Sequence, residues 1–320
     1  MIGGRLAVHG SAGGTASLCL RMSTELTQPS RAGGDDAAPA RRREFTSERQ
    51  FYEPHRVGLP PFVPYVREVW RRREFAMELS RTDLRAQHFD TLFGKFWLVL
   101  NPLLLSGVYF VLLDILRGGR SGPGFFAHLV AGIFAYHFVS GAVRSGVKSV
   151  TSGGKLIMNS AFPRVLLPLS SVITGFKQFL PTMIIYVPIH VITNRPVGWH
   201  LLWVLPLVLM LAVMAAGLSM LVAALQVYFR DLKSLLPYVL RVWLYASPVL
   251  YYASRVPDRY QWLLVANPLA APLSAWSDVL HSGRAPEVWQ LAVGWGWALL
   301  IFGGSLLFFM SREREFAVRL

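Results

Sequence analysis

Six long apolar segments constrain this chain more than any other feature of its sequence. A helix that crosses a hydrocarbon core of roughly 30 Å needs about 20 mostly apolar residues, and each segment approaches that length. The segments are 96–116, 125–143, 165–192, 200–226, 235–252 and 289–311. Because 53% of the residues are hydrophobic and only 16% are charged, a soluble fold is nearly excluded. We predict an all-α integral membrane protein with six transmembrane helices.

Positive charge is unevenly divided between the two sides of this predicted bundle. With both termini placed inside, Lys and Arg residues on the inner side number seven at 67–95, four at 144–164, two at 230–233 and three at 312–319. The outer side carries Arg117, Arg120, Arg195, Arg255, Arg259 and Arg284. Cytoplasmic loops carry the excess of positive charge. We therefore predict a multi-pass protein of the cytoplasmic (inner) membrane with both termini cytoplasmic, and we assign the net charge of +14 to membrane lipids, not to nucleic acid.

The segments outside the predicted six-span domain, 96–311, differ in composition. Residues 1–63 are rich in Gly, Ala, Pro and Arg and lack an apolar period, which predicts a disordered cytoplasmic tail. Residues 64–95 combine many charges with apolar side chains at helical spacing, which predicts an amphipathic helix in the headgroup plane. Its candidate interface residues are Trp70, Arg71, Arg72 and Arg73. A solvated helical linker is the alternative for residues 64–95. Residues 312–320 are predicted to form a short cytoplasmic tail.

The long loop at 253–288 contains an apolar run that is too short to cross the membrane. Asn267-Pro268-Leu269 and Pro272-Leu273 interrupt that run. Non-helical backbone at membrane depth is tolerated where protein covers it. We predict a re-entrant pair of helices on the outer side, before the last span.

No acidic residue lies deep within the predicted spans. The acids between Thr91 and Ser311 fall at span ends or in loops, and they are Asp114, Asp231, Asp258, Asp278 and Glu287. Ion-coupled carriers and membrane enzymes usually place an ionisable group on the pathway or beside the substrate. The phosphate-binding motif G-x-x-x-x-G-K-[ST] and metal-type His and Cys clusters are also absent. We predict no catalytic, cofactor or metal site, so energy for uphill transport must come from a partner chain.

Aromatic side chains recur at helical spacing in the first and fifth segments. The tyrosines of the fifth segment are spaced by seven residues, which places them on one face. Flat amphipathic rings suit sugar faces, and an arginine within a span should face a cavity or a partner. The candidate channel-lining residues are Phe93, Trp97, Asn101, Tyr238, Arg241, Tyr245 and Tyr252. Core packing and interfacial belts are the alternative.

Three blocks of sequence carry recognisable motifs. The first block is LSRTDLRAQHFDTLFGKFWLVLNPLLLSGVYF, a basic helix and a glycine-containing turn before a span that opens with an aromatic residue and Asn-Pro-Leu. The second block, before the third span, is GKLIMNSAFPRVLLPLSSV. The third block, between Val227 and Gly283, contains YFRDLKSLLP, SPVLYYASRVPDR and LLVANPLAAPLSAWSDVL. In this order and spacing, the three blocks resemble the membrane subunits of ABC-type polysaccharide exporters, which export O-antigens, capsules, teichoic acids and cell-wall galactan.

This resemblance implies a homodimer of six-span subunits that sits on two copies of a separate ATPase, which binds ATP and Mg. It also implies that a glycan linked to polyprenyl diphosphate is pushed outward through a channel between the two permeases. Carried over by motif, the ATPase-coupling loop comprises Lys155, Asn159, Phe162, Pro163 and Arg164. The candidate gate helices contain Asn267, Pro268 and Trp276.

Two features of the chain depart from the pattern of these exporters. Asn159-Ser160 replaces the usual second lysine of the coupling block, and the N-terminal tail is longer than is typical. We expect a transport permease without enzymatic activity of its own. The alternatives are an ABC permease for drug or lipid export and a membrane glycosyl- or acyltransferase.

Overall fold

The chain is described by a computed structural model that covers residues 61–88, 94–159 and 162–319. These residues form helices and contain no strand. The long helices are α3 (Trp97–Leu116), α4 (Pro123–Ser152), α6 (Leu166–Ile192), α7 (Val204–Tyr228) and α11 (Val288–Arg312). The shorter α-helices are α1 (Phe62–Arg71), α2 (Arg73–His88), α5 (Gly154–Asn159), α8 (Leu232–Ala246), α9 (Trp262–Ala266), α10 (Ala270–Ser277) and α12 (Phe316–Arg319). Short turns of other helix types are η1 (Gly94–Phe96), η2 (Trp199–Trp203), η3 (Ala253–Arg255), η4 (Asp258–Tyr260), η5 (Asp278–Ser282) and η6 (Glu313–Glu315).

Five helices of the described chain are long and apolar enough to cross a membrane. They are α3, α4, α6, α7 extended by η2, and α11 extended by η6. A sixth candidate exists if the bent pair Asp258–Ala266 and Ala270–Ser282, with 106° between its halves, is one span. The prediction of a multi-span all-helical protein is therefore confirmed.

The fifth predicted segment, 235–252, is wrong in its extent. Helix α8 contains 15 residues and ends at Ala246, so it is about 22 Å long at 1.5 Å per residue and shorter than the hydrocarbon core. Pro248 explains this end, because the proline ring disfavours helical backbone in the preceding residue. Ser247 is accordingly extended, with φ −101° and ψ 150°.

Helix α4 forms the centre of the bundle and packs against both α6 and α7, while α7 packs against α11. Small residues allow these close approaches, as in other membrane helix pairs. A Cβ atom on Gly217 of α7 would lie 2.7 Å from the backbone nitrogen of Phe302 in α11. A Cβ atom on Gly146 of α4 would lie equally close, at 2.7 Å, to the Cβ atom of Ser219 in α7. Neither position therefore leaves room for a side chain, and at Gly217 the neighbouring helix backbone is the limiting contact.

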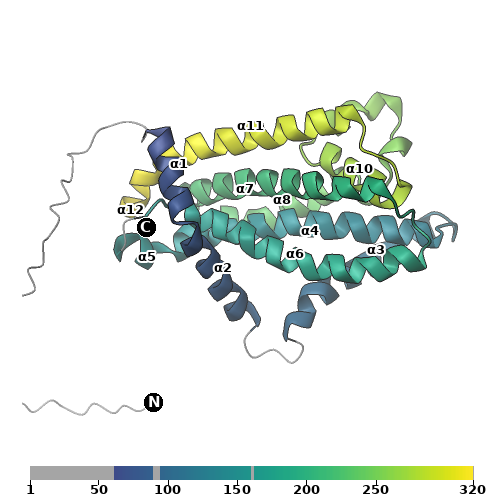
Figure 1. Cartoon of the computed structure of the whole chain (residues 1–320), viewed down its shortest axis with the longest axis horizontal. Coiled ribbons are helices and arrows are strands. Elements are labelled where there is room, and N and C mark those ends of the chain that lie inside the picture. The colour runs from purple at the N-terminus through teal and green to yellow at the C-terminus, as the bar shows by residue number, and fades with distance from the viewer. Residues whose placement is uncertain (1–60, 89–93, 160–161, 320) are drawn as a thin grey trace, which may run out of the picture. The chain divides into compact units, whose positions relative to one another are not determined.

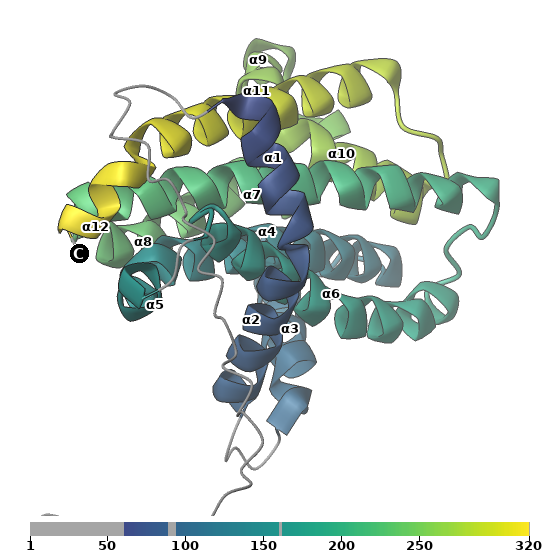
Figure 2. The ribbon, with the colours of Figure 1, turned by 60° about the vertical axis from the view of Figure 1, so that its left-hand side comes forward.

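The two ends of the bundle carry different elements (Figure 1). Helices α1, α5 and α12 lie at one end, which we name the α5 end, and α10 lies at the other, which we name the α10 end. Figure 2 shows α1 crossing over the bundle beside α7 and α11. Because α5 and α12 share an end, the loop before α6 and the end of α11 are close to each other.

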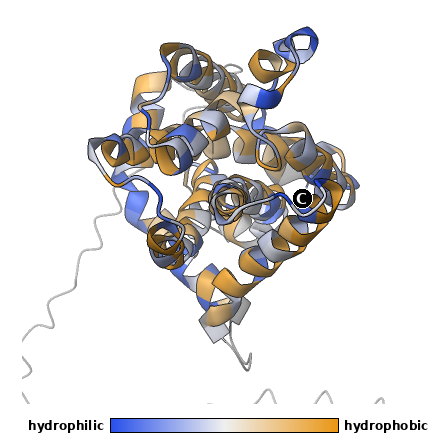
Figure 3. Cartoon of the chain, turned by 90° about the vertical axis from the view of Figure 1, so that its right-hand side faces the viewer, coloured by the Kyte–Doolittle hydropathy of each residue, from blue (hydrophilic) through white to orange (hydrophobic). Residues whose placement is uncertain are grey.

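Many large apolar side chains of the helices are exposed, and Figure 3, viewed from the α10 end, shows that hydrophobic residues make up much of these helices. Helix α3 is an example, because Val108, Val111, Ile115 and Leu116 are all exposed. Exposed apolar surface of this extent indicates contact with lipid or with another protein chain.

The predicted interface helix, 64–95, is divided into two helices. Arg72 lies between α1 and α2 with φ −97° and ψ 18°. Helix α2 packs along α6, where Lys177 Nζ donates to Ser80 Oγ at 3.0 Å. The two helices therefore have different environments: α2 is anchored on the bundle, while α1 exposes Val63, Val66 and Trp70.

Candidate functional site

A cavity of about 170 Å³ lies between α3, α4 and α8. Polar and aromatic side chains line it together with aliphatic ones. The polar lining residues are Tyr109, Tyr136, His137, Ser140, Arg144 and Arg241. Among the described residues, no carboxylate lines the cavity, so its charge is positive.

Two tyrosines of neighbouring helices meet at this cavity. The hydroxyl oxygens of Tyr109 in α3 and Tyr245 in α8 are 3.2 Å apart, and the two rings are perpendicular with centroids 6.2 Å apart. Tyr136 of α4 donates its hydroxyl to the carbonyl of Leu240, which fixes the orientation of its ring. These side chains offer ring surfaces and hydroxyl groups together, a combination that suits sugar contacts.

The predicted aromatic face of α8 is only partly present. Arg241 lines the cavity and Tyr245 contacts Tyr109 there, whereas Tyr238 is 67% exposed. The spacing prediction is wrong for Tyr252, because α8 ends six residues before it. Tyr252 instead packs its ring against His128 at 4.4 Å between centroids.

The predicted residues of the first span lie near the start of α3. Trp97 is half-buried and Asn101 is exposed, and Phe93 lies outside the described residues. Neither Trp97 nor Asn101 is among the residues that line the 170 Å³ cavity. The structure therefore does not place them in the same cavity as Tyr109 and Arg241.

Sequence reasoning missed the contributions of α3 and α4 to the cavity. Tyr136, Ser140 and Arg144 are spaced by four residues, which puts them on one face of α4. That spacing was a usable signal for α4. Tyr109 is the only tyrosine of segment 96–116, so no repeat of tyrosines marks it. Its contact with Tyr245 identifies it instead.

A half-buried polar cluster joins three elements at the α5 end. Tyr65 of α1 donates to Glu313 Oε2 at 2.7 Å. The backbone N–H of Arg164 donates to Glu313 Oε1, and the guanidinium of Arg164 donates to the backbone carbonyl of Glu313. Burial, together with the Glu313 carboxylate, raises the pKa of Tyr65 above its ordinary value, so the hydroxyl remains protonated. Arg164, predicted to dock on a partner, is thus also bound within its own chain.

The rest of the predicted coupling loop lies beside this cluster. The ring centroid of Phe162 is 5.0 Å from that of Phe75 in α2, and Pro163 is buried. Lys155 and Asn159 belong to α5, and their side chains lie outside the described part of the chain. The loop before α6 is therefore packed against α2 and tied to α1 and η6.

The predicted interface residues of α1 and its end are solvent-facing or paired with neighbours. Trp70 is 69% exposed, and the guanidinium of Arg73 lies 4.8 Å from the centre of the Trp70 ring. Arg71 and Arg72 both form ion pairs with Glu68. An exposed tryptophan flanked by arginines is typical of a helix at a membrane surface.

The candidate gate residues connect the bent pair α9 and α10 to the bundle. Asn267 accepts from Trp243 Nε1 at 2.7 Å and donates to the carbonyl of Ala246 at 3.1 Å. Pro268 lies in the bend between α9 and α10. Trp276 is completely buried, and its Nε1 donates to the carbonyl of Ala131 in α4 at 3.0 Å. Trp276 is thus an anchor for α10.

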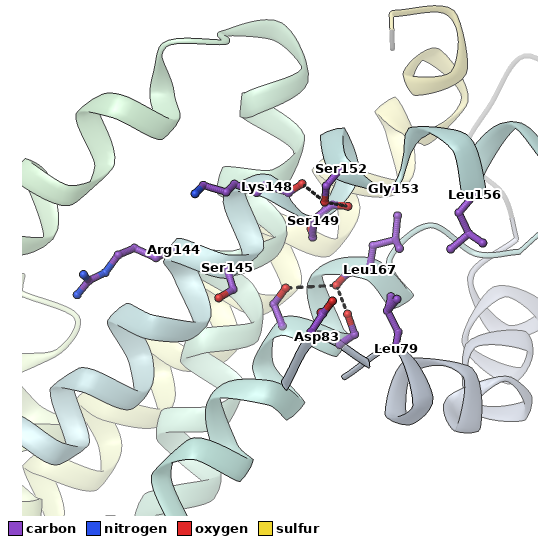
Figure 4. Close-up of a pocket in the computed structure, with 12 residues that line it drawn as sticks. Leu79, Asp83, Arg144, Ser145, Lys148, Ser149, Ser152, Gly153, Leu156 and Leu167 are labelled. Carbon is purple, nitrogen blue, oxygen red and sulfur yellow. Dashed lines mark hydrogen bonds between the residues drawn. The ribbon is translucent and has the colours of Figure 1, made fainter. Parts of the chain in front are cut away.

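A larger cavity, of about 870 Å³, lies near the α5 end between α2, α4, α5 and α6. Arg144 and Lys148 supply positive charge to its lining, and several serines and Asp83 supply polar groups. Figure 4 shows both cationic side chains extending away from Leu79 and Leu156. The positively charged part of the lining is therefore separate from these two leucines, whereas Asp83 lies beside Leu79 (Figure 4).

Within the described residues, no group of three or more His, Cys, Asp or Glu side chains could hold a metal ion.

The long apolar helices define a multi-pass helical membrane protein with a positively charged aromatic cavity in its bundle. The family model for the ABC-2 type transporter matches residues 77–280. The chain belongs to this family, and membership implies an ABC ATPase as a separate partner subunit.

Relatives in this family include proteins named O-antigen export system permease protein RfbA. One from Klebsiella pneumoniae is 26% identical over 208 residues, which are 64% of this chain and 79% of that protein. Another, from Myxococcus xanthus, is 25% identical over 257 residues, which are 80% of this chain and 98% of that protein.

Proposed function

We propose that this chain is the permease subunit of an ATP-driven exporter that moves a polysaccharide across the cytoplasmic membrane. The observation that carries the proposal is the cavity of α3, α4 and α8, which combines tyrosine rings and hydroxyls with arginines and no described carboxylate. Such a lining binds neutral or acidic sugars weakly through stacking and hydrogen bonds. The names of the RfbA relatives support the same substrate class.

The channel is proposed to form between two copies of this chain. Three side chains of α8 are each about half exposed or more, and they are Tyr238, Val242 and Tyr245. Aromatic and apolar side chains left exposed beside a polar cavity are suited to a second subunit. A homodimer would thus place two Tyr109–Tyr245 pairs around one pathway.

The α5 end is proposed to face the cytoplasm and the ATPase. Most Lys and Arg residues of the bundle flank this end, as expected for a cytoplasmic side. Helix α5 and the loop around Phe162 would contact two ATPase copies, which hold ATP and Mg. Arg164, Glu313 and Tyr65 would then pass the movement to α1 and α11, since hydrogen bonds join all three. The bent pair α9 and α10 would be re-entrant from the outside.

The substrate is proposed to be linked to a polyprenyl diphosphate carrier. The amphipathic helix α1 would lie at the cytoplasmic headgroups, beside the leaflet in which such a lipid is made available. Its exposed Trp70 and neighbouring Arg73 are suited to that position.

Depleting the chain from growing cells tests this function. Export predicts that lipid-linked glycan accumulates on the cytoplasmic leaflet while its total synthesis continues. A membrane transferase predicts an unextended acceptor lipid, and a drug or lipid exporter predicts normal glycan export; either result would contradict the proposal. Re-expression of the chain with a hydrolysis-deficient ATPase partner is the control, and it should not restore export.

A further inference from the structure

A second positively charged cavity, of about 540 Å³, lies at the α10 end of the bundle. The loop after α3 and the first turn of α4 form one wall, and Tyr252 and His281 form another. Arg117, Arg120 and Arg255 all line this cavity. Among the described residues, no carboxylate is part of its lining. Its volume lies within the range of about 300–1,000 Å³ that is usual for ligand pockets.

These arginines are a large share of the positive charge at this end. The arginines of the outer loops are Arg117, Arg120, Arg195, Arg255, Arg259 and Arg284. Three of the six line the cavity, and a fourth, Arg195, reaches its wall through His281, with Nη1 3.3 Å from Nδ1. Outer loops of a membrane protein carry few cations, and neighbouring like charges repel. Their concentration at one cavity therefore indicates an anionic ligand.

Nearby acids do not neutralise this cluster. In the described part of the chain, no ion pair joins Arg117, Arg120 or Arg255 to a carboxylate. Asp258 in η4 lies three positions from Arg255, and its Oδ1 accepts from Gln261 Nε2 at 2.7 Å. Asp114 at the end of α3 lies three positions from Arg117, and its Oδ1 accepts from the backbone N–H of Ser121 at 2.8 Å. That carboxylate therefore stabilises the loop.

Aromatic rings hold two of the guanidinium groups in place. The Arg117 guanidinium lies 3.8 Å from the centre of the Phe125 ring, and that of Arg255 lies 5.2 Å from the centre of the Tyr252 ring. A stacked guanidinium keeps its N–H groups available at its edge, where phosphate oxygens bind in pairs. The arrangement thus offers several fixed donors to one anion.

We propose that this cavity binds the phosphate or diphosphate group of an anionic lipid at the outer face of the permease. The proposal rests on the proposed function for its ligand, because a glycan linked to polyprenyl diphosphate brings such a group to this side. Binding there would hold the carrier lipid after the glycan has crossed. Tyr252 and Phe125 would provide apolar contact beside the anion.

The test compares two double variants that each remove two positive charges from the same end. Arg120→Gln with Arg255→Gln changes the cavity, and Arg259→Gln with Arg284→Gln is the matched control. Both variants and the unchanged chain are purified with the ATPase partner in phosphatidylcholine nanodiscs. Binding of radiolabelled geranylgeranyl diphosphate is measured, and unfolding temperatures establish that both variants are folded.

The cavity variant should bind the probe at least about tenfold more weakly, because it removes two charged hydrogen-bond donors to the anion. The control should bind within about twofold of the unchanged chain. Equal affinity in the two variants would overturn the site. Competition by inorganic diphosphate would show that the anion alone is sufficient for recognition, whereas no competition would show that the prenyl chain is also required, and both results support the cavity.

Failure of this proposal can be told apart from failure of the proposed function. Unchanged probe binding in the cavity variant removes the anion site and leaves the depletion result for glycan export as it stands. Normal glycan export in depleted cells removes the proposed function and its ligand assignment. In that case a selective loss of binding in the cavity variant would still support a site for anionic lipid.

Discussion

At the residue scale, the Tyr109–Tyr245 contact determines how many hydrogen bonds the two hydroxyl groups can form with a substrate. The two hydroxyl oxygens are 3.2 Å apart, so one donates to the other and each keeps further hydrogen-bonding capacity. Tyr245 is 48% exposed and lies at the edge of the packed core. A role in transport and a role in packing therefore predict different consequences for its loss.

Replacing Tyr245 with alanine should slow glycan export by about tenfold while lowering the free energy of unfolding by no more than about 1 kcal/mol, as for other partly exposed side chains. The rate at which glycan reaches the outer leaflet and the thermal unfolding of the purified complex give the two values. Tyr260→Ala, at an exposed ring in η4, is the control and should leave export unchanged. A stability loss in proportion to the export loss would assign Tyr245 to packing.

Sequence spacing identifies residues of this site only within one helix. It grouped Arg241 with Tyr245, since they lie one turn apart in α8. It could not join Tyr245 to Tyr109, because the two are 136 positions apart and their contact depends on which faces of α3 and α8 meet. The spacing argument also failed for Tyr252, because it assumed an unbroken helix.

At the scale of elements, apolar length predicts the long helices well, and local breaks are harder to predict. Pro248 marks the end of α8 in the sequence, but prolines within spans are often tolerated. Pro102 and Pro181 lie inside α3 and α6 without ending them. Which proline ends a helix depends on whether neighbouring helices compensate for the lost hydrogen bond, and a single sequence does not contain that information.

Close packing of α7 against α11 gives a prediction at this scale. Gly217→Ala should destabilise the protein by about 1–3 kcal/mol, because its Cβ atom would meet the backbone of Phe302. The matched control is Gly304→Ala in α11, where a Cβ atom meets nothing within 4 Å. That change should be neutral or stabilising by up to about 1 kcal/mol through helix propensity. Thermal unfolding in detergent measures both, and equal stabilities would contradict the direct backbone contact.

At the scale of the whole molecule, the α5 end connects elements that are far apart in sequence. Glu313 accepts hydrogen bonds from Tyr65 in α1 and from Arg164 before α6. Phe162 meanwhile packs on Phe75 of α2. A displacement of the loop at this end would therefore reach α1, α2 and α11 together. The family resemblance indicated the loop, whereas its contacts within the chain follow only from the fold.

This connection predicts that Phe162→Ala combined with Arg164→Ala separates ATP hydrolysis from export. The complex reconstituted with its ATPase should continue to hydrolyse ATP while glycan export falls at least about tenfold, because the substitutions remove the ring contact and the guanidinium bond that tie the loop to the bundle. The spans should remain folded, since both residues lie outside them. Arg85→Ala, at an exposed position of α2, is the control and should keep hydrolysis and export coupled. Full export in the double variant would show that force from the ATPase enters the permease elsewhere.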